Sequence, residues 1–383
     1  MIYRDLQPKV EEVLQKKLVA IVYGARQTGK TTLAKQVAES YKYPLYLNCD
    51  DPTTVTNLTN RSAIELKSYI GNSDMVIIDE AQRVENIGIT IKLLHDSYPD
   101  IPLLVTGSSS LDLSNKITEP LTGRSMELKL YPLSVREVVD SVPAMQPTSK
   151  ILMVRGGYPG MWSLPAEDAE QRLINLANNY LFRDAFSPNV VYDQTIIGNL
   201  LRLLAYQIGN EVNYSEISRR LGVGRDLVER YIDLLEKAFI VFRRNQYKRN
   251  QRSEVGRLRK VYFYDLGIRN ALVDNFRPID SRDDAGVLWE NFCIMERLKY
   301  LACTNRNVQS FYWRNKNKRE IDLVEEEMQQ IRAYEFKLGK KRPKMPLEFA
   351  EYYPHNTYTT INPINFNDLL FDQTNPNQTK LFP

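Results

Sequence analysis

The stretch GARQTGKTT, residues 24–32, constrains this 383-residue chain more than any other part of its sequence. It fits the pattern G-x-x-x-x-G-K-[ST], with an apolar strand pattern before it at 18–23 and a helix pattern after it at 31–41. Glycines let a loop wrap phosphate oxygens closely, and backbone amides with a helix N-terminus attract negative charge. The motif predicts a nucleotide site in which Lys30 reaches the β- and γ-phosphates and Thr31 binds magnesium.

A second motif, DMVIIDEAQ, ends an apolar strand pattern with two acids. Asp79 is placed to hold magnesium through water and Glu80 to polarise the attacking water, although a strand end with an acidic turn has the same pattern. The next strand pattern ends at Ser108, either a γ-phosphate sensor or part of a Ser-rich turn. The predicted nucleotide contacts are Gly24, Ala25, Arg26, Gln27, Thr28, Gly29, Lys30, Thr31, Thr32 and Ser108. Arg124 is either a catalytic arginine, in the same chain or from a neighbouring subunit, or a solvated side chain.

Four short apolar runs, at 18–24, 44–50, 74–80 and 101–109, alternate with helix patterns in the first third of the chain. This alternation predicts an α/β layer with a mostly parallel sheet.

The middle of the chain reads as a helix-turn-helix followed by strands. Residues 213–240 give two helix patterns around the tight turn LGVGR, with Ser215 as the expected N-cap, and strand patterns follow at 239–247 and 259–265. The basic residues of the segment 241–260 are Arg243, Arg244, Lys248, Arg249, Arg252, Arg257, Arg259 and Lys260, against the single acid Glu254. Such a wing can neutralise DNA phosphates, or it can pack between domains or face solvent.

Near its end the chain reads REIDLVEEEMQQIRAYEFKLGKK, residues 319–341, which predicts a β-hairpin with a tight loop at 327–330. That pairing sets Asp322 opposite Glu335, with Lys337 beside them, and places Ile321, Leu323, Tyr334, Phe336 and Leu338 on one core face. Like charges directly opposite are destabilising, so a cation must compensate, either Lys337 or a divalent metal. The chain has two histidines and three scattered cysteines, so a metal site here must use carboxylates, which suit Mg²⁺ or Mn²⁺.

Together, GARQTGKTTL, IIDEAQRV, TGSSSLDL, LTGRSMELKLYPLSVREV and GGYPG resemble the AAA-type ATPases of bacteria and archaea that carry a C-terminal DUF4143 region. The resemblance covers most of the chain and implies an ATP-binding domain, a winged-helix region and a tail of restriction-endonuclease-like, PD-(D/E)XK, fold. In that fold Asp322, Glu335 and Lys337 match the D…E-x-K core, and Glu290 or Glu296 on the preceding helix adds an acid, with Glu290 aligning better. The chain departs from the family at Ala25, where proline is commoner, and at Glu290, where many such nucleases have histidine.

The expected fold is therefore α/β in several parts. The expected divisions are a P-loop core at 1–140, a helical lid or linker region at 141–195, a winged helix-turn-helix at 196–274 and a PD-(D/E)XK nuclease-like domain at 275–383. The expected ligands are ATP or ADP with Mg²⁺, then Mg²⁺ or Mn²⁺ at Glu290, Asp322 and Glu335, and DNA contacted through 243–260 and the nuclease-like domain.

Two classes of function fit these features. One is an ATP-hydrolysing enzyme acting on DNA, with Mg²⁺- or Mn²⁺-dependent deoxyribonuclease chemistry in its tail. The other is a nucleotide-switched DNA- or protein-binding module with an inactive tail, and a helicase is a third option. The longest apolar runs are too short to cross a bilayer, and we expect a cytoplasmic protein. The sequence leaves open whether it forms a homo-oligomer.

Overall fold

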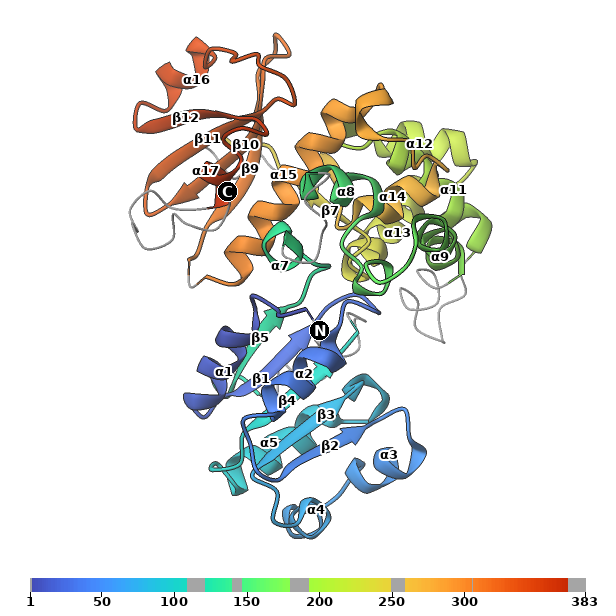
Figure 1. Ribbon diagram of the computed structural model, residues 1–383, viewed down its shortest axis with the longest axis vertical. Coiled ribbons are helices and arrows are strands. Elements are labelled where there is room, and N and C mark those ends of the chain that lie inside the picture. Colours follow the sequence, from blue (N-terminus) through green and yellow to red (C-terminus); the bar gives the residue numbers. More distant parts are fainter. Residues whose placement is uncertain are drawn as a thin grey trace.

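The computed structural model describes residues 2–108, 121–139, 147–179, 193–248, 259–304 and 306–370. An N-terminal α/β unit forms the lower half of the molecule in Figure 1. A helical middle region with a small sheet and a C-terminal sheet domain lie side by side above it. The long helix α15, Ala285–Ala302, runs between the C-terminal sheet and the middle region.

The N-terminal unit is built on five parallel strands in the order β2-β3-β4-β1-β5. The strands are β1 Val19–Tyr23, β2 Pro44–Asn48, β3 Met75–Asp79, β4 Leu103–Gly107 and β5 Ser125–Lys129, and the helices are α1 Gln7–Gln15, α2 Lys30–Ala38, α3 Pro52–Leu58, α4 Ala63–Ile70 and α5 Ile87–Ser97. Strands β1, β3 and β4 are buried throughout because apolar clusters cover both faces of the sheet. The four predicted strands are confirmed. The edge strand β5 was not predicted, because most of it is half-buried or exposed and its sequence lacks an apolar run.

The middle region combines helices with a three-stranded antiparallel sheet in the order β6-β8-β7. Its elements are α7 Val135–Val138, α8 Thr148–Arg155, α9 Ala166–Asn179, α11 Gln194–Tyr206, β6 Glu211–Val212, α12 Tyr214–Leu221, α13 Arg225–Lys237, β7 Val241–Arg244, β8 Arg259–Phe263 and α14 Leu266–Leu272. The predicted helix pair is present, with Gly222 in the left-handed region at φ 66°. The predicted N-cap is wrong: Asn213, not Ser215, caps α12, since its side chain accepts from the amides of Ser215 and Glu216. The winged-helix assignment stays a prediction.

The C-terminal domain is a mixed sheet between helices. Its strands are β9 Gln309–Arg314, β10 Glu320–Glu327, β11 Gln330–Phe336 and β12 Asn356–Ile361, in the order β12-β11-β10-β9, and its short helices are α16 Leu347–Tyr352 and α17 Asn367–Leu370. Leu323, Tyr334 and Phe336 join the apolar cluster that includes α15, while Ile321 and Val324 pack with Phe349 of α16 on the other face.

The β10–β11 hairpin has the predicted tight loop. Glu327 pairs with Gln330 across a two-residue turn, and Leu323 pairs with Tyr334, so the same register carried one residue further brings Asp322 beside Glu335. The expected common face for Ile321 and Leu323 is wrong. A bulge against β9 between Ile321 and Val324 breaks the alternation and turns these two side chains to opposite faces.

In the described part of the chain, we find no helix whose length and apolar character would suit a membrane span.

Candidate nucleotide site and acid cluster

The loop between β1 and α2 brings a buried lysine against its own backbone. A side chain at Gly24 would place Cβ 2.2 Å from the carbonyl oxygen of Leu130, so the loop can approach the end of β5 only with glycine there. Gly29 needs the same freedom because its φ is 94°. The Nζ atom of Lys30 donates to the carbonyl oxygens of Gly24 at 2.9 Å and Ala25 at 3.0 Å. The ammonium group is therefore held at the concave side of a glycine loop, next to the N-terminus of α2.

A hydroxyl and a carboxylate meet beside this loop. Thr31 Oγ1 donates to Asp79 Oδ2 at 2.7 Å, and the hydroxyls of Tyr46 and Thr106 also donate to Asp79, which is buried. The carboxyl ends of β1, β3 and β4 lie at one edge of the sheet, which is where open α/β sheets bind ligands. Thr31 and Asp79 thus have the oxygen donors, at contact distance, that a phosphate-bound Mg²⁺ needs.

Three polar side chains continue this edge of the sheet. Glu80 follows Asp79 with φ 55°, and the amide of Gln82 donates both to the Glu80 carboxylate and to Ser108 Oγ, the latter at 3.0 Å. The predicted acid and the predicted γ-phosphate sensor therefore share one neighbour. Gln82 was not predicted, although it stands only two residues beyond Glu80.

Arg124 lies at the other edge of the sheet. It precedes Ser125, which pairs with Val19 at the start of β1, whereas the phosphate loop follows the last residue of that strand. Its Nε lies 2.7 Å from a carboxylate oxygen of Asp96. Of the alternatives left open for Arg124, this placement disfavours action on the nucleotide of its own chain, because a full strand length separates Arg124 from the phosphate loop. Its action on a neighbouring subunit stays a prediction.

Arg4 is a buried residue that no sequence motif indicated. Its Nη1 donates to the carbonyl of Thr28 in the loop at 2.6 Å, its Nη2 to the carbonyl of Tyr131 at 2.6 Å, and its Nε to Glu137 at 2.9 Å. It also borders a cavity of about 180 Å³ beside the start of α2, lined by Ile2, Arg4, Gly29, Thr32, Leu133 and Pro159. The N-terminal segment therefore closes one side of the loop, and predicted contact Thr32 faces this cavity.

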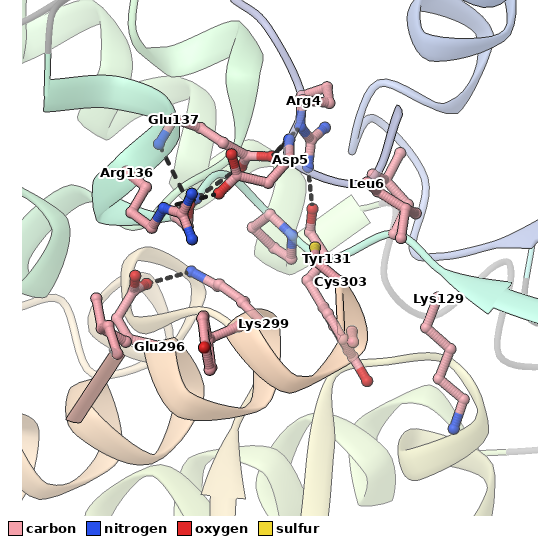
Figure 2. Close-up of a pocket in the computed structure, with 16 residues that line it drawn as sticks. Arg4, Asp5, Leu6, Lys129, Tyr131, Arg136, Glu137, Glu296, Lys299 and Cys303 are labelled. Atoms are coloured by element: carbon pink, nitrogen blue, oxygen red, sulfur yellow. Dashed lines mark hydrogen bonds and ion pairs between the residues drawn. The ribbon is translucent and has the colours of Figure 1, made fainter. Parts of the chain in front are cut away.

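The contacts around Arg4 continue to helix α15, as Figure 2 shows. The backbone amide of Val135, in the same short helix as Glu137, donates to Glu296 on α15 at 2.8 Å. Lys299, one turn further along α15, pairs with Glu296 at 2.7 Å and donates to the carbonyl of Leu133 at 2.8 Å. A small cavity of about 30 Å³ lies between these groups. Glu296, the alternative acid on this helix, therefore joins α15 to residues 133–135, which follow β5, and does not face the hairpin.

Three carboxylates converge where α15 meets β10. One oxygen each from Glu290, Glu320 and Asp322 lies within 4.8 Å of the others. The structure thus brings together the predicted Glu290 and Asp322. It adds Glu320, which shares a strand face with Asp322 by simple alternation but was not selected as a ligand. Lys260 of β8 reaches this cluster: its Nζ lies 3.0 Å from Glu290 Oε1 and also pairs with Glu320.

Burial shapes the charges in this acid cluster (Glu290, Glu320 and Asp322). Burial disfavours the ammonium of Lys260, but Tyr262, Glu290, Glu320 and Asp322 outweigh it, so the pKa of Lys260 lies well above its usual value. Burial, followed by the charges of Glu290 and Glu335, raises the pKa of Asp322 well above its usual value. Lys260 therefore stays positively charged beside the three acids. Even with this cation nearby, burial and the neighbouring carboxylates disfavour the ionised form of Asp322.

Glu335 and Lys337 lie next to the acid cluster and contact each other. Lys337 Nζ is 2.7 Å from Glu335 Oε1. Among the described residues, Glu335 Oε2 is one of the buried oxygens that lack a hydrogen-bond partner. An unpaired buried carboxylate oxygen is costly, and a cation bound there would satisfy it. In the part of the chain that the structure describes, the three carboxylates that come within 4.8 Å of one another are Glu290, Glu320 and Asp322, oxygen donors that suit a hard divalent cation, whereas the predicted ligand Glu335 lies outside this group.

The basic segment 243–260 is less available to DNA than its composition indicates. Arg243 pairs with Asp233 and Glu236, Arg244 is buried, and Lys260 is held in the acid cluster. The expectation that these three face DNA phosphates is corrected, because Arg243 and Lys260 are paired with acids of the protein and Arg244 is buried. Arg249, Arg252, Glu254 and Arg257 lie outside the described residues.

Sequence comparisons agree with this geometry. Residues 16–139 match a family model described as an AAA domain, residues 148–278 match a domain of unknown function, DUF8612, and residues 285–366 match another, DUF4143. These matches bear out the predicted AAA-type domain over residues 16–139 and the predicted DUF4143 region over residues 285–366.

Similar proteins span much of the chain. An uncharacterized protein of Mycobacterium tuberculosis is 28% identical over 84% of this chain and 71% of its own length. An uncharacterized protein of Methanocaldococcus jannaschii is 23% identical over 91% of this chain and 82% of its own. Among solved structures, a Walker-type ATPase of Pyrococcus abyssi aligns with TM-score 0.48 and 17% identity, over 70% of this chain and 95% of that one.

Proposed function

We propose that this protein hydrolyses ATP to ADP and phosphate and uses its nucleotide state to control action on DNA by the C-terminal domain. One observation supports the proposed ATP hydrolysis most strongly. Thr31 Oγ1 lies 2.7 Å from Asp79 Oδ2, at the mouth of the glycine loop that holds Lys30. The loop amides and Lys30 bind the phosphates, and Thr31 and Asp79 hold Mg²⁺, which offsets charge on the transferred phosphoryl group. Glu80 orients the attacking water.

The cavity beside the loop suits the nucleoside. Ile2, Leu133 and Pro159 give it apolar walls, and Gly29 and Thr32 connect it to the phosphate loop. A base bound there would rest against Arg4, which ties the loop to residues 131–137. Nucleotide binding would therefore affect the hydrogen bonds between Arg4 and residues 131–137. That segment also contacts Glu296 on α15, the helix that carries Glu290.

For the C-terminal domain we propose metal-dependent cleavage of a DNA phosphodiester. Glu290, Asp322 and Glu335 would hold Mg²⁺ or Mn²⁺. An ion held there would supply Lewis-acid chemistry for the attack of water on the phosphodiester. Lys337, about one-third exposed and paired with Glu335, is placed to orient or deprotonate that water.

One observation favours a second candidate, a nucleotide-switched DNA- or protein-binding protein without tail chemistry. Lys260 already neutralises Glu290 and Glu320, as a structural ion pair would. In that case the acid cluster only joins β8 to α15 and β10.

The test combines phosphate release from ATP with cleavage of linear, nicked and branched DNA, in Mg²⁺ or Mn²⁺, with and without ATP. Lys30→Ala should abolish ATP hydrolysis and alter cleavage, while Asp322→Ala and Lys337→Ala should abolish cleavage and keep ATP hydrolysis. ATP hydrolysis without any cleavage by the wild-type protein would favour the second candidate. Absence of ATP hydrolysis would refute the first half of the proposal.

A further inference from the structure

A cleft of about 1000 Å³ opens beside the acid cluster. Its walls are the segment that follows β7, the turn that joins β9 to β10, and helix α16. Residues of the middle region and of the C-terminal domain meet here directly, since the amide of Tyr247 donates to the carbonyl of Tyr312 at 2.6 Å. The cleft is at the upper limit of volumes typical for small-molecule sites, so it suits a segment of polymer better than a metabolite.

The cleft lining is positively charged. Four cationic side chains, Lys248, Arg314, Lys316 and Lys318, line it against two carboxylates, Glu211 and Glu348. Glu211 is already paired with Arg314 at 2.8 Å, and Glu348 accepts from the side-chain amides of Asn315 and Asn317. Lys316 and Lys318 are exposed at the rim, where a polyanion would meet them first.

Aromatic rings form a packed floor beneath these cations. Tyr247 lies 5.0 Å from Tyr353 between ring centroids, Tyr353 lies 4.9 Å from Phe349, and Phe349 meets Trp313 edge to face at 5.3 Å. Tyr352, by contrast, is 65% exposed at the end of α16 and lines the cleft. A rigid aromatic floor with one exposed ring beside cations is the combination on which unpaired bases stack while phosphates bind lysine.

The cleft also connects to the acid cluster. Arg314 lines the cleft, and besides its pair with Glu211 its Nε lies 3.7 Å from Glu320 Oε2. A strand that runs along the cleft therefore passes Arg314 and reaches Glu320 and Asp322. We propose that this cleft binds single-stranded DNA, with phosphates on Lys316 and Lys318 and a base on Tyr352. This inference rests on the proposed action on DNA. It names single-stranded DNA as the substrate of that action, because the bases of a duplex are not free to stack on protein rings.

The test is fluorescence anisotropy of a labelled single strand of ~15 nucleotides and of the matching duplex, with the full-length protein in EDTA over a range of salt concentrations. The variants are Lys316→Glu with Lys318→Glu, and Tyr352→Ala. A matched charge control is Lys16→Glu with Lys42→Glu on the exposed surface of the N-terminal unit.

We expect the wild-type protein to prefer the single strand. The charge reversal should weaken binding at least tenfold and lower the slope of log affinity against log salt by about 1.4, the value for two phosphate contacts on a single strand. Tyr352→Ala should weaken binding about tenfold and leave the slope unchanged. The matched control should stay within about twofold, since it removes the same charge elsewhere.

Two results would overturn the cleft assignment: wild-type affinity in both cleft variants, or equal affinity of the wild-type protein for strand and duplex. If the wild-type protein bound no DNA at all, the proposed action on DNA would fail as well. If the wild-type protein bound DNA and the cleft variants bound it equally well, only the assignment of binding to the cleft would be rejected.

Discussion

At the phosphate loop a buried lysine faces neutral carbonyl groups, whereas at the acid cluster a buried lysine faces carboxylates. Lys30 donates to the backbone of Gly24 and Ala25, and Lys260 is paired with Glu290 and Glu320. A phosphate entering the loop would replace these backbone hydrogen bonds. A metal ion entering the acid cluster would compete with the ammonium group of Lys260. The predicted nucleotide site thus offers a cation to its ligand, whereas in the acid cluster the chain itself supplies the cation.

The first and largest change in stability should follow from removal of Lys260, which supplies the cation of the acid cluster. Lys260→Met should lower the free energy of unfolding by about 2–4 kcal/mol without metal, because it leaves the partly buried carboxylates of Glu290 and Glu320 without their cation. Urea denaturation measures this loss, and Mn²⁺ should restore part of it in the variant. Lys299→Met is the matched control on the Glu296 side of α15, and Mn²⁺ should not rescue it. If Mn²⁺ left the Lys260 variant as unstable as before, the acids would be a structural ion-pair cluster.

The second prediction concerns Lys30 in the phosphate loop. Lys30→Ala should lower the turnover of ATP about 10²–10³-fold, because it removes the cation aimed at the transferred phosphoryl group. Phosphate release measures turnover, and circular dichroism checks that the fold is retained. Lys16→Ala, at an exposed position of the same N-terminal unit, should behave like the wild-type protein. If both variants lost the same turnover, the position of Lys30 in the loop would not be the cause of the loss.

The third prediction sharpens the link between the two sites. Arg4→Ala should raise KM for ATP roughly tenfold or more, because it releases the loop carbonyl of Thr28 from Tyr131 and Glu137 and misplaces the phosphate contacts. Steady-state kinetics measures the change. Arg61→Ala, which breaks an exposed pair with Glu65, serves as the control. An unchanged KM in Arg4→Ala would separate the N-terminal segment from nucleotide binding.

The smallest expected effect concerns the start of α15, which carries both Glu290 and Glu296. Burial works against the charge of Asp284, but hydrogen bonds from Arg282 and Arg269 outweigh it and lower the pKa of this carboxyl to about 2. A lowered pKa stabilises the fold above the ordinary value of 3.8, and this contribution is lost as the pH falls toward 2.

Asp284→Asn should therefore cost about 1–2 kcal/mol at neutral pH, a value reduced for the partial exposure of the carboxylate. Denaturation at several pH values measures the difference, which should shrink as the pH falls from about 4 to 2. A difference that stayed constant over this range would show that the charge of Asp284 is not its source.

Local spacing was sufficient to predict the phosphate loop, the acid at the end of β3 and the hairpin that carries Asp322 and Glu335, because each rests on neighbours within one or two elements. The bulge beside Asp322 was not predictable, since it depends on how β9 pairs with β10.

Residues that act across long separations in sequence were missed. Arg4 contacts Tyr131 and Glu137, and Lys260 contacts Glu290 and Glu320, because the fold packs together elements that are far apart in the sequence. For Lys260 the sequence misled as well, because a basic run resembles a DNA-binding surface until the structure shows where its charges are paired.

Mn²⁺ binding to the full-length protein would show whether the acid cluster holds a divalent cation in competition with Lys260. Electron paramagnetic resonance of free Mn²⁺ would be followed without nucleotide in an Asp79→Asn background, which removes the proposed metal ligand of the nucleotide site. We expect weak Mn²⁺ binding that Glu290→Gln with Asp322→Asn abolishes and that Lys260→Met strengthens about tenfold or more. Mn²⁺ binding that none of these three substitutions changes, or no binding even in Lys260→Met, would show that the cluster is not a cation site.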